Sequence, residues 1–203
     1  VIKSLNNNSV STYGEEVRAF EDKLREHSNL EAIAVNSGTS ALEVSIDCYF
    51  NQLDRKEKYN IGFCDFTFIA TPNAILNTSN NAIPFPCNPD DFLPDLGYLE
   101  KRLKNSLNLD LFVFTLPFGN FSKNVEKTLN FLKEFEIPII LDAAASICLD
   151  FSKIKHVIEH SCISVCLSFN GNKVITSGAG GAILTPDECF SNRARSLITL
   201  HRI

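Results

Sequence analysis

An excess of positive charge is absent from this sequence. Lysine and arginine together number 19 and aspartate and glutamate 24, so the formal net charge is −5. A protein that binds the phosphate backbone of DNA or RNA through many contacts needs a basic surface. We therefore expect no nucleic acid partner, and a phosphate-bearing small molecule would need a local binding site.

Long apolar runs, a secretory signal and paired cysteines are also absent. No stretch approaches the roughly 18 to 20 apolar residues that span a bilayer, and the N-terminus lacks the charged-then-apolar order of a signal peptide. The seven cysteines are an odd number and form no CxxC pair, which argues against a disulfide framework or a zinc site. We expect a soluble cytoplasmic protein with reduced cysteines in its core.

The chain alternates strand-like apolar runs with amphipathic helices. Hydrophobic residues make up 44% of the 203 residues, which suffices for one globular core. The sequence predicts strands at 32–35, 59–63, 82–85, 111–115, 137–141, 163–167 and 181–184, and helices at 14–27, 41–50, 95–104 and 122–135. This order predicts an α/β domain whose mostly parallel sheet is covered by helices on both faces, because parallel strands need crossover connections. Ligands of such sheets bind at the carboxyl ends of the strands.

A short polar turn, Ser37-Gly38-Thr39-Ser40, joins the first predicted strand to a helix. Backbone N–H groups and small hydroxyls at the positive end of a helix can bind a phosphate. The same side chains can instead serve only to cap the helix. The turn by itself leaves both interpretations open.

Asp142 directly follows the apolar run 137–141, so a carboxylate stands at the carboxyl end of a buried strand. A buried charge without a partner is costly, and Asp142 therefore needs one. A functional partner would be a protonated pyridine nitrogen, whose charge Asp142 would maintain so that the ring withdraws electrons. The alternative is that Asp142 caps the segment 143–147.

Lys173 lies between the end of the predicted strand 163–167 and the glycine-rich segment 177–181. A lysine at this position can reach across a cleft to an aldehyde. A desolvated cleft keeps a fraction of the lysine amines in the neutral, nucleophilic form. A lone lysine is otherwise a solvated surface charge. Its small, turn-forming neighbours favour the cleft interpretation.

These three segments, in this order, resemble the DegT/DnrJ/StrS family of sugar aminotransferases, which use pyridoxal 5′-phosphate (PLP). The similarity extends from about Ser11 nearly to the end of the chain. The family motifs SGTxA, TFxAT, DAA and SFxxxK…GxGG match Ser37–Ala41, Thr67–Thr71, Asp142–Ala144, and Ser168-Phe169 with Lys173 and Gly178–Gly181.

The resemblance implies that residues 1–203 form the PLP-binding large domain of a fold-type-I PLP transferase, with Lys173 forming the internal Schiff base. Asp142 would contact the ring nitrogen and Phe68 would stack on the ring. The phosphate would be bound by Gly38, Thr39, Ser40 and Ser168. The family further implies a homodimer with a shared active site, and transfer of an amino group from a donor such as glutamate to a keto group of a nucleotide-linked sugar.

The family's smaller C-terminal domain is absent from this sequence, which also begins at Val1 and contains no methionine. We therefore expect a fragment of a longer protein.

Three residues depart from the family pattern. Ala145 replaces the usual Gln or His, Asn170 replaces a common His, and Ala179 replaces a frequent Glu. These departures keep open an alternative, a degenerate PLP-fold protein with a structural or regulatory role and no transamination. The presence of Lys173 argues against the dehydratase branch, in which histidine replaces this lysine.

The segment 156–160 has the HxxEH pattern of a class of zinc metalloproteases. The pattern fixes only three residues, and Glu188 is the only later glutamate that could supply a third ligand. We expect a solvated turn here and no bound metal.

Overall fold

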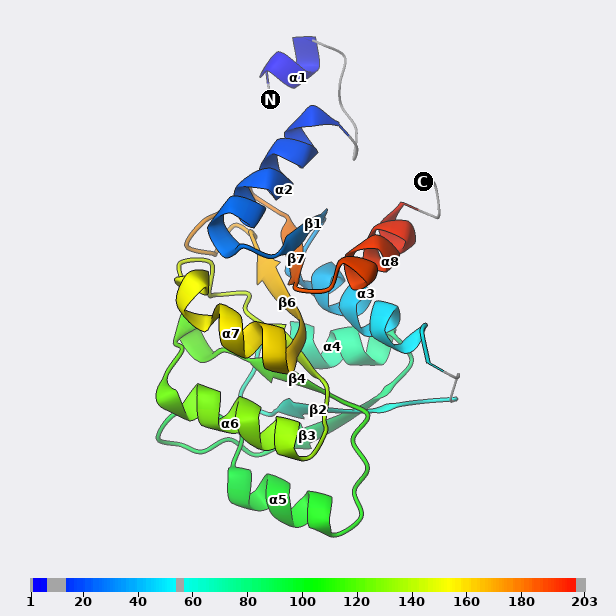
Figure 1. Ribbon diagram of the computed structural model, residues 1–203, viewed down its shortest axis with the longest axis vertical. Helices are drawn as coiled ribbons and strands as arrows, with labels where there is room; N and C mark the ends of the chain where they lie inside the picture. The colour runs from blue at the N-terminus through cyan, green and yellow to red at the C-terminus, as the bar shows by residue number, and fades with distance from the viewer. Residues whose placement is uncertain (1, 7–13, 54–56, 200–203) are drawn as a thin grey trace.

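The computed structural model describes residues 2–6, 14–53 and 57–199 (Figure 1). Its helices are α1 (Ile2–Asn6), α2 (Glu15–Ser28), α3 (Gly38–Phe50), α4 (Ala70–Asn77), α5 (Leu96–Lys104), α6 (Lys123–Glu134), α7 (Phe151–Ser161) and α8 (Glu188–Ile198), with a short 3-10 helix, η1 (Pro117–Gly119). Its strands are β1 (Glu31–Val35), β2 (Asn60–Cys64), β3 (Asn81–Phe85), β4 (Leu111–Thr115), β5 (Ile139–Asp142), β6 (Cys162–Ser168) and β7 (Gly181–Thr185).

The strands form one seven-stranded sheet in the order β1-β7-β6-β5-β4-β2-β3. Strand β7 is antiparallel to both of its neighbours, β1 and β6. The pairs among β6, β5, β4, β2 and β3 are all parallel. The prediction of a mostly parallel sheet is therefore confirmed.

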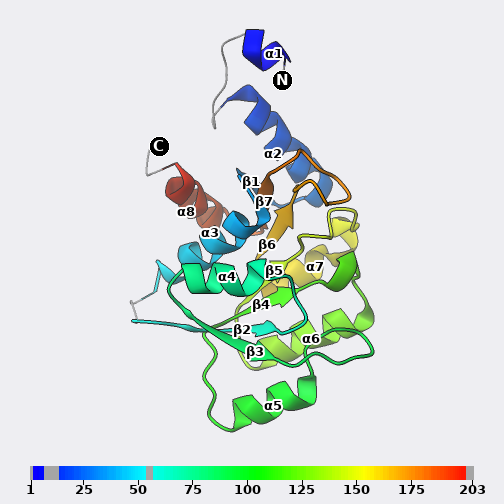
Figure 2. The same ribbon diagram turned by 180° about the vertical axis from the view of Figure 1, so that it is seen from behind.

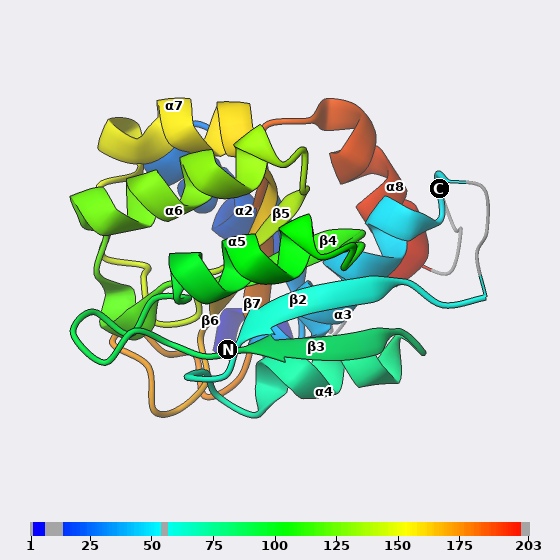
Figure 3. The same ribbon diagram turned by 90° about the horizontal axis from the view of Figure 1, so that it is seen from below.

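Helices cover both faces of the sheet. Alternate residues of a strand point to opposite faces, and in β5 Ile139 and Leu141 join one core while Ile140 joins the other. The first core includes residues of α2, α5, α6 and α7, and the second includes residues of α3, α4 and α8. Figure 2 shows α3 and α4 in front of the sheet, and Figure 3 shows α5, α6 and α7 on the side opposite α4.

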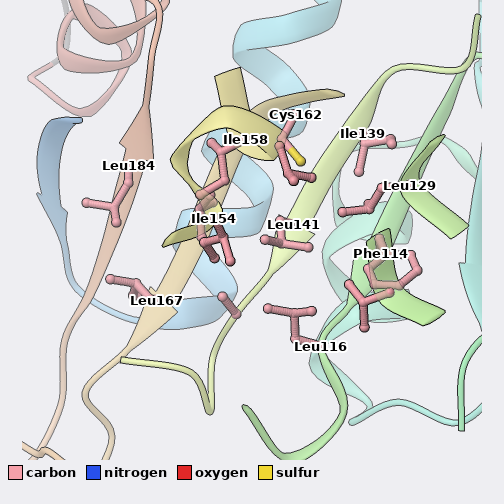
Figure 4. Packing of buried hydrophobic residues seen from close by; sticks show 14 of the residues in the cluster. Phe114, Leu116, Leu129, Ile139, Leu141, Ile154, Ile158, Cys162, Leu167 and Leu184 are labelled. Atoms are coloured by element: carbon pink, nitrogen blue, oxygen red, sulfur yellow. The ribbon is translucent and has the colours of Figure 1, made fainter. Parts of the chain in front are cut away.

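The first core includes buried residues of β4, β5 and β6. Phe114, Leu129 and Leu141 are fully buried there, and Figure 4 shows them facing one another from β4, α6 and β5. Burying a side chain of this size contributes about 1.5–3 kcal/mol. The core therefore fixes the carboxyl ends of these strands, where Asp142 and Ser168 lie.

The buried carboxylate of Glu21 fixes the position of β1, the strand that precedes the turn at 37–40. Glu21 of α2 is buried, accepts a hydrogen bond from the backbone N–H of Ala34 at 2.9 Å, and forms an ion pair with Arg195 of α8 at 2.9 Å. Arg195 also donates to the carbonyl oxygen of Ala32 at 2.6 Å. This network joins α2, β1 and α8, so the strand that leads into the turn is anchored from two helices.

Two expectations from the sequence need correction. The HxxEH segment lies in the helix α7 and not in a turn, although His156, Glu159 and His160 are exposed. All seven cysteines are free, but Cys148 and Cys189 are exposed instead of lying in the core. Among the residues described, no helix is both long enough and apolar enough to cross a membrane.

Candidate active site

A pocket with a volume of about 270 Å³ lies at the carboxyl ends of β5 and β6. Segments far apart in the sequence supply its walls: the turn before α3, the start of α4, the end of β5 and the loop from β6 to β7. The residues that line it are Ser37, Gly38, Thr39, Leu42, Phe68, Ala70, Asp142, Ala144, Ser168, Asn170, Asn172, Lys173, Ala179 and Gly180.

The turn at 37–40 caps α3 and also faces this pocket. The hydroxyl oxygen of Ser37 accepts a hydrogen bond from the backbone N–H of Ser40 at 3.0 Å, so Ser37 is the cap residue. Gly38 and Thr39 line the pocket at the start of α3, where the first N–H groups of a helix have no partner within the helix. Both interpretations of the turn therefore have structural support.

Ser40 is placed differently from Gly38 and Thr39. Its hydroxyl accepts a hydrogen bond from the Ser37 hydroxyl at 3.0 Å, and it is not among the residues that line the pocket. The sequence-based assignment of Ser40 to a phosphate therefore has less support than that of its two neighbours. Ser37, which that assignment omitted, lines the pocket.

The turn packs directly against the end of β6 and the start of β7. A Cβ atom built on Gly38 would lie 2.8 Å from the Cβ of Ser168, and one built on Gly181 would overlap the Ser37 carbonyl group. Only glycine permits this approach at either position. The close approach brings Ser168 to the same wall as Gly38 and Thr39.

Asp142 provides a buried carboxylate at the pocket. Its residue is 5% exposed, its Oδ2 accepts from the Thr71 hydroxyl at 2.7 Å, and its Oδ1 accepts from the backbone N–H of Ala144 at 3.2 Å. Burial raises the pKa of Asp142, while the Thr71 hydroxyl, the Ala144 N–H and the positive charge of Lys173 act in the opposite direction. A carboxylate has about four lone-pair positions, so Asp142 can accept a further donor from the pocket.

Lys173 and Phe68 line the same pocket as Asp142. Lys173 is partly buried, and its backbone N–H donates to the carbonyl oxygen of Asn170 at 3.0 Å, which fixes the turn after β6. Phe68 is 72% exposed, so its ring is free to contact a ligand. The structure thus brings together Gly38, Thr39, Phe68, Asp142, Ser168 and Lys173.

The three departures from the family pattern have different surroundings. Asn170 and Ala179 line the pocket. Ala145 is exposed and lies against Gly119, whose Cβ, if present, would be 2.6 Å from the Ala145 carbonyl oxygen. Asn170 donates to the Asn172 side chain at 3.2 Å, so its amide is already oriented by a neighbour.

The metal-binding alternative has no cluster to support it within the described part of the chain. No group of three or more His, Cys, Asp or Glu side chains there could hold a metal ion. His156 approaches Glu126 at 3.9 Å, and the His160 ring nitrogen Nδ1 lies 2.6 Å from the carbonyl oxygen of His156. These contacts are those of an exposed helix surface.

Comparisons with known proteins agree with this fold and this order of motifs. The model of the DegT/DnrJ/EryC1/StrS aminotransferase family matches residues 1–201. EpsN of Bacillus subtilis (strain 168), named as a pyridoxal phosphate-dependent aminotransferase, is 28% identical over 206 residues, which cover 100% of this chain and 52% of that protein. The UDP-4-amino-4,6-dideoxy-N-acetyl-beta-L-altrosamine transaminase of Campylobacter jejuni (strain 81-176) is 32% identical over 190 residues, or 93% of this chain and 48% of that protein.

Among solved structures, DesV of S. venezuelae has the same fold. Its TM-score is 0.79 at 19% identity, over 98% of this chain and 52% of that chain. The chain thus spans about half the length of the curated relatives it matches. The resemblance drawn from the motifs is confirmed, and the chain belongs to the DegT/DnrJ/EryC1/StrS aminotransferase family.

Proposed function

We propose that this chain is the cofactor-binding large domain of a PLP-dependent aminotransferase that transfers an amino group, from a donor such as glutamate, to a keto group of a nucleotide-linked sugar. One observation carries the proposal: Lys173, the buried Asp142 and the start of α3 line a single pocket. The names of the two curated relatives support the cofactor and the substrate class.

The residues present suit PLP in charge and position. Asp142 keeps acceptor capacity toward the pocket and can bind a protonated ring nitrogen. Gly38 and Thr39 at the start of α3, with Ser168 packed against Gly38, form a site for a phosphate. Phe68 offers an exposed aromatic ring for stacking.

When bound, PLP supplies an aldehyde carbon that bonds covalently to amines and a ring that withdraws electrons. Lys173 would hold the cofactor through its Nζ atom until the amino substrate displaces it. The freed Nζ would then take a proton from the substrate carbon and return it, as a general base and acid. Asp142 would keep the positive charge on the ring nitrogen.

The direct test uses the intact gene product, glutamate and a panel of nucleotide-linked keto-sugars. We expect visible-region absorbance from bound PLP and formation of 2-oxoglutarate that depends on one of the sugars. A colourless protein, or one that forms no 2-oxoglutarate with any of the sugars, would favour the degenerate, non-enzymatic alternative.

We also propose that the protein acts as a homodimer in the cytoplasm. Phe66, Phe92 and Phe118 form an exposed cluster, in which Phe66 stacks on Phe92 with ring centroids 4.5 Å apart. Phe118 is 77% exposed and has a positive φ of 51°, an uncommon and costly conformation for a bulky residue. An exposed apolar cluster of this kind is typical of an interaction surface. The free cysteines support a reducing location.

Phe118→Asp is expected to weaken the dimer by roughly 30-fold or more, the effect of losing one aromatic hot spot. Sedimentation velocity over a dilution series would measure the dissociation constant. Leu53→Asp, which changes an exposed apolar residue after α3, is the matched control and should have no such effect. An unchanged dissociation constant in Phe118→Asp would place the dimer contact elsewhere.

A further inference from the structure

Three threonine hydroxyls form a hydrogen-bonded chain that ends on Asp142. Thr115 ends β4, Thr67 lies in the loop after β2, and Thr71 lies in the first turns of α4. The Oγ1 atoms of Thr115 and Thr67 are 2.9 Å apart, as are those of Thr67 and Thr71. Thr71 then donates to Oδ2 of Asp142 at 2.7 Å.

An ionised Asp142 fixes the direction of every bond in this chain. A carboxylate only accepts hydrogen bonds, and each threonine hydroxyl has one hydrogen to donate. Thr71 uses its hydrogen on Asp142, so Thr67 must donate to Thr71 and Thr115 must donate to Thr67. Hydroxyl bonds aligned in one direction polarise one another, so the last donor is stronger than an isolated hydroxyl.

Thr71 also contacts Phe68, which lines the pocket. Its backbone N–H donates to the carbonyl oxygen of Phe68 at 3.1 Å, and Thr67 precedes Phe68 in the chain. Thr71 is fully buried, so its side chain has no alternative position in solvent. One residue therefore connects the carboxylate of Asp142 to the loop that carries Phe68.

We propose that Thr71, at the end of the Thr115-Thr67-Thr71 chain, is a positioning residue that holds Asp142 ionised and oriented toward the pocket while fixing the loop of Phe68. This inference rests on the proposed function, because the group that Asp142 would contact is the cofactor ring. The hydroxyl chain satisfies one carboxylate oxygen and leaves acceptor capacity for that ring. Without the chain, burial would favour the neutral acid, which cannot neutralise a positive ring nitrogen.

The charged and titratable groups near Asp142 do not replace this donor. Lys173, in the loop after β6, favours the ionised carboxylate through its charge. Cys166 pairs with Asp142 across β5 and β6, and burial raises the pKa of its thiol to about 12, so it stays neutral at physiological pH. The Thr71 hydroxyl and the charge of Lys173 both lower the pKa of Asp142, against the effect of burial.

The test compares Thr71→Val, Thr71→Ser and Thr67→Val in the intact gene product. Thr128→Val is the matched control, because Thr128 is a buried threonine of α6 whose hydroxyl bonds the carbonyl oxygen of Asn124 at 2.8 Å, away from the pocket. The primary readout is the titration of the Asp142 carboxyl, followed by ¹³C NMR of the cofactor-free protein and assigned with Asp142→Asn. The second readout is PLP affinity at neutral pH.

In Thr71→Val we expect Asp142 to titrate at higher pH than in the wild type, because the lost donor stabilised the ionised form. PLP affinity should fall by about 10- to 100-fold, the range for one hydrogen bond to a charged group. Thr71→Ser should titrate as the wild type does. In Thr67→Val the pH at which Asp142 titrates should also rise, but by less. In Thr128→Val it should stay unchanged.

A wild-type titration in Thr71→Val would overturn the proposal. If Thr71→Val does not fold, the same measurements on Thr67→Val test the proposal instead. A wild-type titration of Asp142 together with wild-type PLP affinity in Thr67→Val would then overturn the proposal. The titration uses neither cofactor nor sugar, so its outcome is separate from that of the transamination assay. A shifted titration in a protein without transaminase activity would support the role of Thr71 and contradict the proposed function.

Discussion

Lys173→Ala is expected to abolish transamination while leaving the fold intact. The variant lacks the amine that would bond the cofactor aldehyde and would move the proton at the substrate carbon. Loss of a positioned proton-transfer group alone costs about 10²- to 10⁴-fold in rate, and loss of covalent attachment adds to this. Lys173 is only partly buried in a turn, so circular dichroism and the unfolding temperature should stay close to those of the wild type.

Lys155→Ala is the matched control for this experiment. Lys155 lies on α7 and forms an ion pair with Glu159 at 3.4 Å, and such pairs contribute little to stability. The control should keep wild-type turnover and absorbance. Turnover by Lys173→Ala above background would contradict the assignment of the nucleophile.

Asp142→Asn is expected to slow proton removal from the substrate carbon by orders of magnitude while still permitting cofactor binding. A neutral amide cannot keep the ring nitrogen positively charged, so the ring withdraws electrons less strongly in the transition state. Single-turnover kinetics with glutamate would measure this step directly. A wild-type rate in the variant would refute the role of Asp142.

The same substitution has a second, opposite consequence in the cofactor-free protein. Burial raises the pKa of Asp142 above its value in the unfolded chain. At pH values between the unfolded and the folded pKa, the folded state therefore binds more protons than the unfolded state does. The stability that this group contributes is complete below the unfolded pKa and is lost as pH rises through the folded pKa. At neutral pH we therefore expect Asp142→Asn to be at least as stable as the wild type, and the difference should shrink toward acidic pH. Thermal denaturation across this pH range would check the sign.

Much of the sheet could be predicted because each strand is a short apolar run. In β4, Phe112 and Phe114 face one core and Leu111 and Val113 the other, so the run is apolar throughout, as expected for a strand buried on both faces. The antiparallel placement of β7 could not be predicted, since it depends on how the loop after β6 returns. The strand at 137–141 begins at Ile139, because Pro138 has no N–H to donate.

Four α-helices, α1, α4, α7 and α8, were missed, and the reasons for the last three can be identified. α4 carries Pro72 in its first turn. A proline usually predicts the end of a helix, although it is tolerated in the first turn. α7 buries Phe151, Ile154 and Ile158 at helical spacing, but the polar residues 156 and 159–160 obscured the pattern. α8 buries Phe190 and Ala194 four residues apart, and its cap, Asp187, was a signal that could have been used.

The candidate site could be located from the sequence because the ends of parallel strands converge at one edge of the sheet. Asp142 ends β5, Ser168 ends β6, Lys173 lies in the loop after β6, and all three line one pocket. The threonine chain could not be deduced, since it joins residues 67, 71, 115 and 142 only in three dimensions. Its members did carry sequence signals: Thr67 and Thr71 are the ends of the motif at 67–71, and Thr115 is a polar residue at the end of an apolar run, as Asp142 is.

The most direct test of the account is to find the residue that carries the cofactor. Borohydride treatment of the intact gene product loaded with PLP makes the bond between a lysine and the cofactor aldehyde permanent, and peptide mass mapping then identifies that lysine. We predict the adduct on Lys173, in the peptide that follows β6. An adduct on any other lysine, such as Lys155 of α7, would contradict the assignment of this pocket as the active site.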